Sequence, residues 1–144
     1  MEPILELHGI TKIFPGVLAN DHIDLKLNKG EILAILGENG AGKTTLMNIL
    51  YGLYSQDEGI IKIKGQKIDI QSPTDAINAG IGMVHQHFML IPVFTVTDNV
   101  MLGNEYLYPG GFLDRQKASK HIKELSDLYK LNINPQSLIE DLPV

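Results

Sequence analysis

The chain has 144 residues, of which 44 % are hydrophobic and 20 % are charged, and its formal net charge is −5. This length and composition are typical of one globular domain, and the acidic balance argues against non-specific binding to nucleic acid or anionic membranes. The absence of cysteine excludes disulfides and thiolate metal sites. Because the start shows no signal-peptide pattern and no apolar run has membrane-spanning length, we expect a cytosolic chain that would act at a membrane through a partner.

Alternating apolar residues predict the first two elements. Residues 4–8 and 21–27 place apolar side chains on one face, as expected for half-buried strands of an antiparallel layer. A turn at 28–30 leads into a predicted central strand at 31–36, whose continuous apolar run 32–36 is that of a parallel strand buried on both faces. Apolar residues then recur at helical spacing, which predicts a helix over about 43–53 with a buried stripe of Leu46, Ile49, Leu50 and Leu53.

Between this strand and this helix lies the sequence GENGAGKTT, residues 37–45, which fits the pattern G-x-x-x-x-G-K-[ST] of a phosphate-binding loop. Unpaired amides and the dipole at the start of a helix attract phosphate. Glycines at 37, 40 and 42 permit positive φ and a close approach of backbone to ligand. The residues predicted to bind the nucleotide here are Gly37, Asn39, Gly40, Ala41, Gly42, Lys43, Thr44 and Thr45.

Three side chains of this loop carry the predicted chemistry. Lys43 can reach the β- and γ-phosphates as a point charge, Thr44 can offer its hydroxyl to Mg²⁺, and Thr45 can donate to the α-phosphate. The loop therefore predicts a nucleoside triphosphate with magnesium, without identifying the base or the use of the energy.

Further strands and one helix are predicted downstream of the loop. Residues 60–63 and 67–70 predict a hairpin, and residues 81–84 predict a second buried core strand. Between them, Ser72 as N-cap and Pro73 at the first helical position predict a helix that ends at Gly80.

Beyond residue 95 the pattern becomes helical. Thr97 and Asp98 predict the cap of a short helix through Leu102, and Pro135 predicts a last helical turn. A longer helix is predicted to begin at an Asp114 cap, with an apolar stripe of Ala118, Ile122, Leu125 and Tyr129.

Three further stretches resemble one family, the ATP-binding cassette (ABC) ATPases that drive ABC transporters, and the resemblance covers essentially the whole chain. The first is residues 10–14, followed by Pro15-Gly16 and Asn20-Asp21. In that family an aromatic residue at this position stacks on adenine, so the resemblance implies that role for Phe14. A packed aromatic at a strand end is the alternative interpretation.

The second stretch is residues 84–87, which resemble the family's Q-loop. The resemblance implies that Gln86 contacts Mg²⁺ or the attacking water, so that Lys43 and Gln86 are the catalytic residues and Thr44 and Gln86 the metal-binding ones. His85 and His87 would share one strand face, but without a third ligand a separate metal site is not favoured.

The third stretch is the apolar run 88–94, where the family receives a short helix of the membrane subunit. A docking surface and packing between two subdomains are equally compatible with this run. The sequence of residues 82–100 is similar to that of sugar and nucleoside importers, whose ATPase chains usually carry two cassettes in tandem.

Leu142-Pro143-Val144 resembles the start of the family's signature motif, with Pro143 in place of the usual serine, and we expect the motif to be cut off there. The Walker B aspartate, its neighbouring glutamate and the switch histidine are not found. Since phosphoryl transfer needs several such groups together, we predict that these 144 residues alone do not hydrolyse ATP.

The resulting prediction is an α/β P-loop NTPase of ABC type, incomplete, with an antiparallel β layer and a parallel-sheet core leading into a helical subdomain. Residues 1–94 would form the ATP-binding core and residues 95–144 the start of the helical subdomain. The resemblance implies the Mg-ATP-driven motor of a sugar or nucleoside importer on the cytoplasmic face of the membrane. Its partners would be a permease, a second cassette and, indirectly, a solute-binding protein, with no nucleic acid. Alternatives are a soluble ABC-type ATPase of repair or translation and a nucleotide-binding module without turnover.

Overall fold

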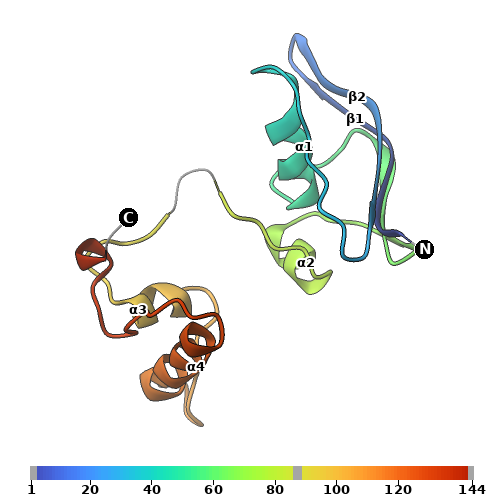
Figure 1. Cartoon of the computed structure of the whole chain (residues 1–144). Helices are drawn as coiled ribbons and strands as arrows, with labels where there is room; N and C mark the ends of the chain where they lie inside the picture. Colours follow the sequence, from blue (N-terminus) through green and yellow to red (C-terminus); the bar gives the residue numbers. More distant parts are fainter. Residues whose placement is uncertain (1–2, 86–88, 143–144) are drawn as a thin grey trace. The chain divides into compact units, whose positions relative to one another are not determined.

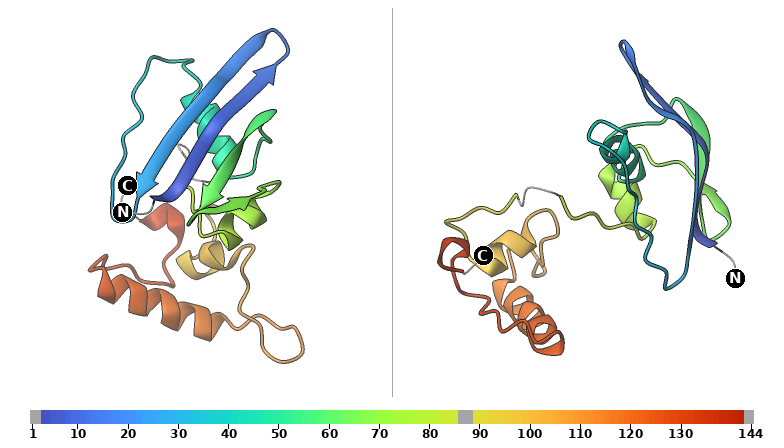
Figure 2. Two further views of the ribbon diagram at one scale, coloured as in Figure 1. Left: turned by 90° about the vertical axis from the view of Figure 1, so that its right-hand side faces the viewer. Right: turned by 45° about the horizontal axis from the view of Figure 1, so that its top comes forward.

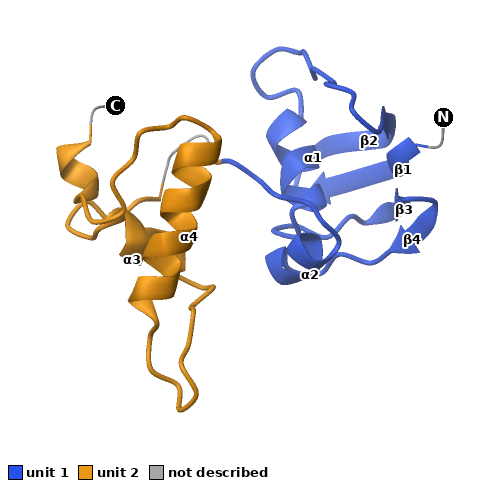
Figure 3. Cartoon of the chain, turned by 60° about the horizontal axis from the view of Figure 1, so that its bottom comes forward, with its two compact units in different colours: residues 1–84 blue, residues 85–144 orange. Residues whose placement is uncertain are grey.

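The computed structural model describes residues 3–85 and 89–142, which form two compact units divided at Val84 and His85 (Figure 3). The functional division predicted at residues 94 and 95 stays a prediction. Within the described residues, no helix is both long enough and apolar enough to cross a membrane.

The first unit contains an antiparallel sheet with the strand order β2-β1-β3-β4. Its strands are β1 (Pro3–Phe14), β2 (Val17–Asn28), β3 (Glu58–Ile63) and β4 (Gln66–Ile68), and Figure 2 shows the first three side by side. The predicted antiparallel layer is confirmed, although β1 and β2 extend well beyond residues 4–8 and 21–27. A two-residue turn at Lys64 and Gly65, both with positive φ, closes the predicted hairpin in the type I′ manner.

Two helices, α1 (Lys43–Leu50) and α2 (Pro73–Asn78), cover one face of this sheet (Figure 1). The core between the layers consists of Leu7, Ile10, Leu46, Ile49, Leu50, Ile61, Ile70 and Ala76. Helix α2 begins as predicted, with the Ser72 side chain accepting a hydrogen bond from the Asp75 N–H. The helix predicted over about 43–53 ends earlier.

Helix α1 stops because Gly52 adopts a φ of +77°. The amides of Gly52 and Leu53 then turn back to the carbonyls of Ile49 and Asn48, which is the Schellman pattern of a helix C-terminus. Leu53 consequently lies outside the helix and is exposed, so its predicted place on the buried stripe is wrong.

The two predicted core strands are not strands in this structure. Residues 31–36 form an irregular exposed segment, with Ile32 97 % and Leu36 91 % exposed, and residues 81–84 are likewise irregular, with Val84 82 % exposed. A buried parallel strand needs hydrogen-bonding neighbours on both edges and cover on both faces. The four strands of the described residues pair only with one another, so neither segment finds a neighbour.

The second unit is built on α3 (Val96–Met101) and α4 (Arg115–Leu128), with a short 3₁₀ helix at Ile139–Asp141. Helix α3 is capped by Thr95, two residues before the predicted cap, because the Thr95 hydroxyl accepts the Asp98 N–H. The Asp114 cap of α4 is confirmed.

The apolar stripe predicted for α4 is only partly buried. Ala118 and Ile122 are buried, whereas Leu125 is exposed and Tyr129 lies exposed beyond the last helical residue. The third buried position is Ser126, whose hydroxyl bonds to the backbone N–H and carbonyl of Ile133. A polar residue held by the following chain thus takes the place expected for an apolar one.

Candidate functional site

The phosphate-binding loop predicted over residues 37–45 enters α1 at Gly42, which is the N-cap of the helix and has a φ of +82°. Gly40 also has positive φ, at +85°, so the conformational prediction is confirmed for both. It is wrong for Gly37, which lacks positive φ. Its surroundings are nevertheless narrow, because a Cβ at Gly37 would lie 3.3 Å from the Cβ of Ala41 and would push one of them aside by a few tenths of an ångström.

Lys43, the first residue of α1, folds its side chain back across the loop. Its Nζ atom donates to the carbonyl oxygens of Gly37 and Glu38, each at 2.7 Å. The loop is closed on itself by the Ala41 N–H, which donates to the Glu38 carbonyl at 3.2 Å. The ammonium group is therefore held over the backbone of the loop.

The start of α1 supplies further donors to the same region. The first hydrogen bond inside the helix runs from the Leu46 N–H to the Gly42 carbonyl, at 3.0 Å. The amides of Lys43, Thr44 and Thr45 precede that bond and have no acceptor within the helix. Because residues 37–41 are exposed, solvent and ligands reach this end of the helix.

Thr44 is the candidate magnesium ligand, and its side chain is exposed in the first turn of α1. The described residues contain no group of three or more His, Cys, Asp or Glu side chains able to hold a metal ion by themselves. A hydroxyl beside a phosphate cradle fits magnesium, because Mg²⁺ binds through few protein ligands together with phosphate oxygens and water.

Phe14, the candidate base-stacking residue, lies at the end of β1 and is half-buried. Its ring centroid is 5.4 Å from that of Tyr54, with the ring planes at 76°, an edge-to-face arrangement. The Nζ of Lys12 lies 5.6 Å from the centre of the Phe14 ring. Both interpretations of Phe14 remain open, because this pairing leaves the ring partly accessible.

Asp57 holds this end of β1 in place. Its carboxylate accepts the Ile13 N–H at 2.6 Å and the Lys12 ammonium at 3.0 Å. These two donors, with the backbone N–H the stronger cause, lower the pKa of the carboxyl group. This arrangement is not predictable from the local sequence, since Asp57 lies 44 positions after Ile13. Only the shared strand face of Lys12 and Phe14 gave a signal, because residues two apart point the same way.

Gln86 and His87 lie outside the described residues, as do Phe88, Pro143 and Val144. The predicted role of Gln86 as a ligand of magnesium or of the attacking water therefore stays a prediction. The same holds for the expectation that residues 142–144 begin a signature motif.

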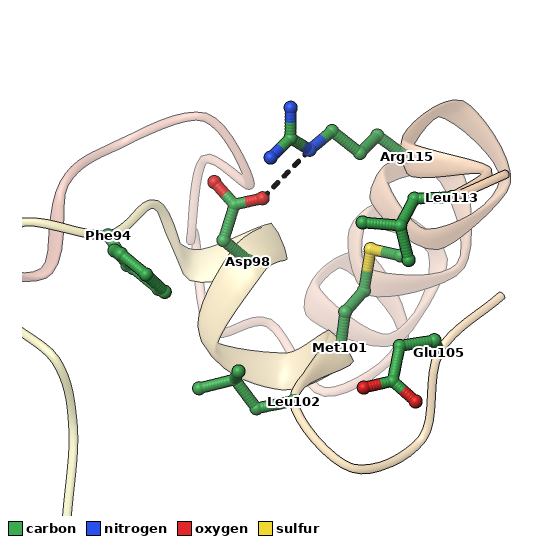
Figure 4. Close-up of a pocket in the computed structure, with 7 residues that line it drawn as sticks. All are labelled: Phe94, Asp98, Met101, Leu102, Glu105, Leu113 and Arg115. Carbon is green, nitrogen blue, oxygen red and sulfur yellow. Dashed lines mark ion pairs between the residues drawn. The ribbon is translucent and has the colours of Figure 1, made fainter.

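The second unit contains a pocket of about 170 Å³ between α3 and the start of α4 (Figure 4). Apolar and charged side chains line it together, and two of the charged ones, Asp98 and Arg115, form an ion pair with an oxygen–nitrogen distance of 2.9 Å. The remaining lining residues are Phe94, Met101, Leu102, Glu105 and Leu113. Of the predicted docking run 88–94, Phe94 lines this pocket, and Met89 and Val93 are largely exposed.

Comparison with known proteins gives consistent results. The chain is 50 % identical over 146 residues to a guanosine import ATP-binding protein of Bacillus subtilis and 52 % identical over 151 residues to a glucose import ATP-binding protein of Haloferax volcanii. The alignment with the Bacillus relative covers 100 % of this chain and the alignment with the Haloferax relative covers 98 % of it. In each case the matched part is 28 % of the relative's length. These 144 residues thus correspond to about a quarter of the curated relatives that they match.

Solved structures support the fold. The chain superposes on the ADP conformation of an ATP-binding cassette of an ABC transporter with a TM-score of 0.80 and 24 % identity, covering 99 % of this chain and 60 % of that one. The predicted class, an incomplete P-loop NTPase of ABC type, is confirmed. The family model described as "ABC transporter" matches residues 20–141. The family implies nucleotide binding, and this chain belongs to the ABC transporter family.

Proposed function

We propose that these 144 residues bind Mg-ATP as the first part of the ATPase subunit of an ABC importer. The observation that carries this proposal is the loop at the start of α1, where Lys43 Nζ lies 2.7 Å from two loop carbonyls beside the free amides of the first helical turn. An ammonium, aligned N–H groups and a helix dipole together favour a polyphosphate over other anions.

Each residue of the loop would contact a different part of the bound nucleotide. Lys43 would face the β- and γ-phosphates, the amides of residues 43–45 would hold phosphate oxygens, and Thr44 would orient the metal ion. Bound magnesium would neutralise charge on the phosphate oxygens. Phe14, fixed by its contact with Tyr54, would offer a ring to the base. Gln86 would complete the site.

Turnover requires a general base that the described residues do not offer. Asp57 is engaged by Ile13 and Lys12, and Asp75 by the hydroxyl of Ser72 at 2.7 Å, which lowers the pKa of its carboxyl group. Glu38 lies in the exposed loop, where no hydrogen bond within the described residues holds its carboxylate in place to orient a water. We infer that these residues alone bind the nucleotide without hydrolysing it.

In the whole protein, the same site would drive a permease from the cytoplasmic face of the membrane, with a second cassette completing the nucleotide site and a solute-binding protein acting indirectly. The exposed apolar side chains of Met89 and Val93 would offer a surface for the permease, and the pocket of the second unit, which Phe94 lines, would extend it. Nucleosides and sugars are the proposed solutes, because the relatives are named for guanosine and glucose import.

Titration calorimetry of the 144-residue chain with Mg-ATP tests the proposal. We expect binding that falls at least about 100-fold in Lys43→Ala, since a charged contact to phosphate is lost, and little change in Lys29→Ala, a lysine in an exposed turn. Phosphate release should stay at background in both variants and in the unchanged chain. Equal affinities of Lys43→Ala and the unchanged chain would refute the site, and steady phosphate release that needs Lys43 would refute the absence of turnover.

A further inference from the structure

Asn20 of β2 is a buried polar residue to which the proposed nucleotide site gives no role. It is 5 % exposed and pairs across the sheet with Lys12 of β1. Its Nδ2 donates to the carbonyl oxygen of Gly42 at 3.3 Å. Its Oδ1 is the one buried side-chain nitrogen or oxygen atom of the described residues that has no hydrogen-bond partner.

The contact between Asn20 and Gly42 is enforced by close packing of the backbone. A Cβ on Gly42 would overlap the carbonyl oxygen of Ala19 and would lie 2.9 Å from the Asn20 Nδ2. The N-terminus of α1 thus rests directly on β2 at residues 19 and 20. No side chain caps this helix, so the hydrogen bond from Asn20 is a side-chain restraint on its first carbonyl.

Holding the Gly42 carbonyl also orients the next amide. The peptide group is planar and trans, so the Gly42 C=O and the Lys43 N–H point in opposite directions within one plane. The carbonyl is held by two donors on its side, Asn20 Nδ2 and the Leu46 N–H. The Lys43 N–H is therefore directed to the other side, toward the loop that Lys43 closes.

An unpaired buried oxygen indicates that packing alone does not explain an asparagine at this position. A buried polar atom without a partner destabilises the fold, and an apolar side chain of similar size, such as leucine, would avoid that cost. The amide donor is the property that leucine lacks. The value of Asn20 should then be found in the geometry of the loop and not in stability.

We propose that Asn20 is a positioning residue for the phosphate-binding loop, acting through the Gly42–Lys43 peptide group. The proposal rests on the proposed nucleotide site. It predicts opposite effects of Asn20→Leu on two quantities: weaker phosphate binding, and thermal stability that is unchanged or raised.

The test measures dissociation constants of the 144-residue chain for Mg-ATP and for tripolyphosphate, with the thermal midpoint of the nucleotide-free chain. For Asn20→Leu we expect about tenfold weaker binding of both ligands, as the loss of one hydrogen bond would give. We also expect a shifted Lys43 amide resonance and a midpoint no lower than that of the unchanged chain. Asn78→Leu, at an exposed position of α2, controls for the substitution itself.

Asn20→Asp provides a second variant that keeps the shape of the side chain. Its ionised carboxylate would face the Gly42 carbonyl without a donor, whereas its protonated form could donate, and burial raises the pKa of such a group. Its affinity relative to that of the unchanged chain should therefore recover as the pH falls. This comparison decides the matter if Asn20→Leu does not fold.

The outcomes distinguish failure of the positioning role of Asn20 from failure of the proposed nucleotide site. Affinities of both Asn20 variants within twofold of the unchanged chain, with Lys43→Ala still deficient, would overturn the role of Asn20 and leave the nucleotide site standing. A loss for Mg-ATP without a loss for tripolyphosphate would also overturn it, since the defect would then concern the base. No effect of Lys43→Ala would refute the site itself.

Discussion

The two flanks of the phosphate-binding loop behave differently, although both are apolar in sequence. Helix α1, after the loop, buries Leu46, Ile49 and Leu50 against the sheet. Residues 31–36, before the loop, remain irregular and exposed. The difference lies in what each element needs from its surroundings.

A helix satisfies its own backbone and requires only one apolar surface, which the antiparallel sheet provides. A buried parallel strand requires neighbouring strands on both edges and layers on both faces. The described residues supply the apolar surface that the helix needs, but not the neighbouring strands and layers that the parallel strand needs. The loop thus joins an element whose packing is complete to one whose packing is not.

The largest predicted effect concerns a pair of isoleucines on opposite flanks. Ile49→Ala should lower the free energy of unfolding by about 2–5 kcal/mol, because Ile49 is fully buried. Ile32→Ala should change it by less than about 0.5 kcal/mol, since that side chain is exposed. Urea unfolding followed by circular dichroism measures both. Similar losses for the two variants would show that residues 31–36 are packed in solution.

A smaller difference is predicted between two glycines of the loop. Gly42→Ala should cost about 2–3 kcal/mol, because a Cβ would both strain a positive φ and overlap the Ala19 carbonyl. Gly40→Ala has open space around it and should cost only about 1 kcal/mol. Thermal unfolding compares them, and the affinity for Mg-ATP should fall further in Gly42→Ala. An equal cost at both positions would argue against close packing of the loop on β2.

The smallest effect concerns acid sensitivity at the end of β1. The pKa of the Asp57 carboxyl group is lowered in the folded state, so its stabilising contribution is present above the unfolded pKa and is lost as the pH falls through the folded one. Asp57→Asn should therefore lose less stability than the unchanged chain when the pH is lowered below about 4. Thermal midpoints between neutral and acidic pH measure this. A parallel pH dependence would contradict the contacts of Asp57 with Ile13 and Lys12.

The local elements were largely predictable because their signals are local. The Ser72 and Asp114 caps, the hairpin at Lys64-Gly65 and the positive φ of Gly40 and Gly42 all follow from the conformational preferences of a few adjacent residues. The phosphate-binding motif is likewise contained within nine consecutive residues, 37–45, so its chemistry could be predicted from them. Errors arose where a neighbour far along the chain decides the outcome, as at residues 31–36 and 81–84 and at Leu125.

By itself, the sequence determined the phosphate-binding loop, its lysine and threonines, and the family to which the chain belongs, since these reside in contiguous residues and their spacing. The tertiary structure alone decided which apolar runs are buried and which residues support the loop. Asn20 lies 22 positions before the carbonyl that it contacts, and Asp57 lies 44 positions after the amide that it binds. Such contacts depend on how strands and loops pack together, so no local sequence pattern predicts them.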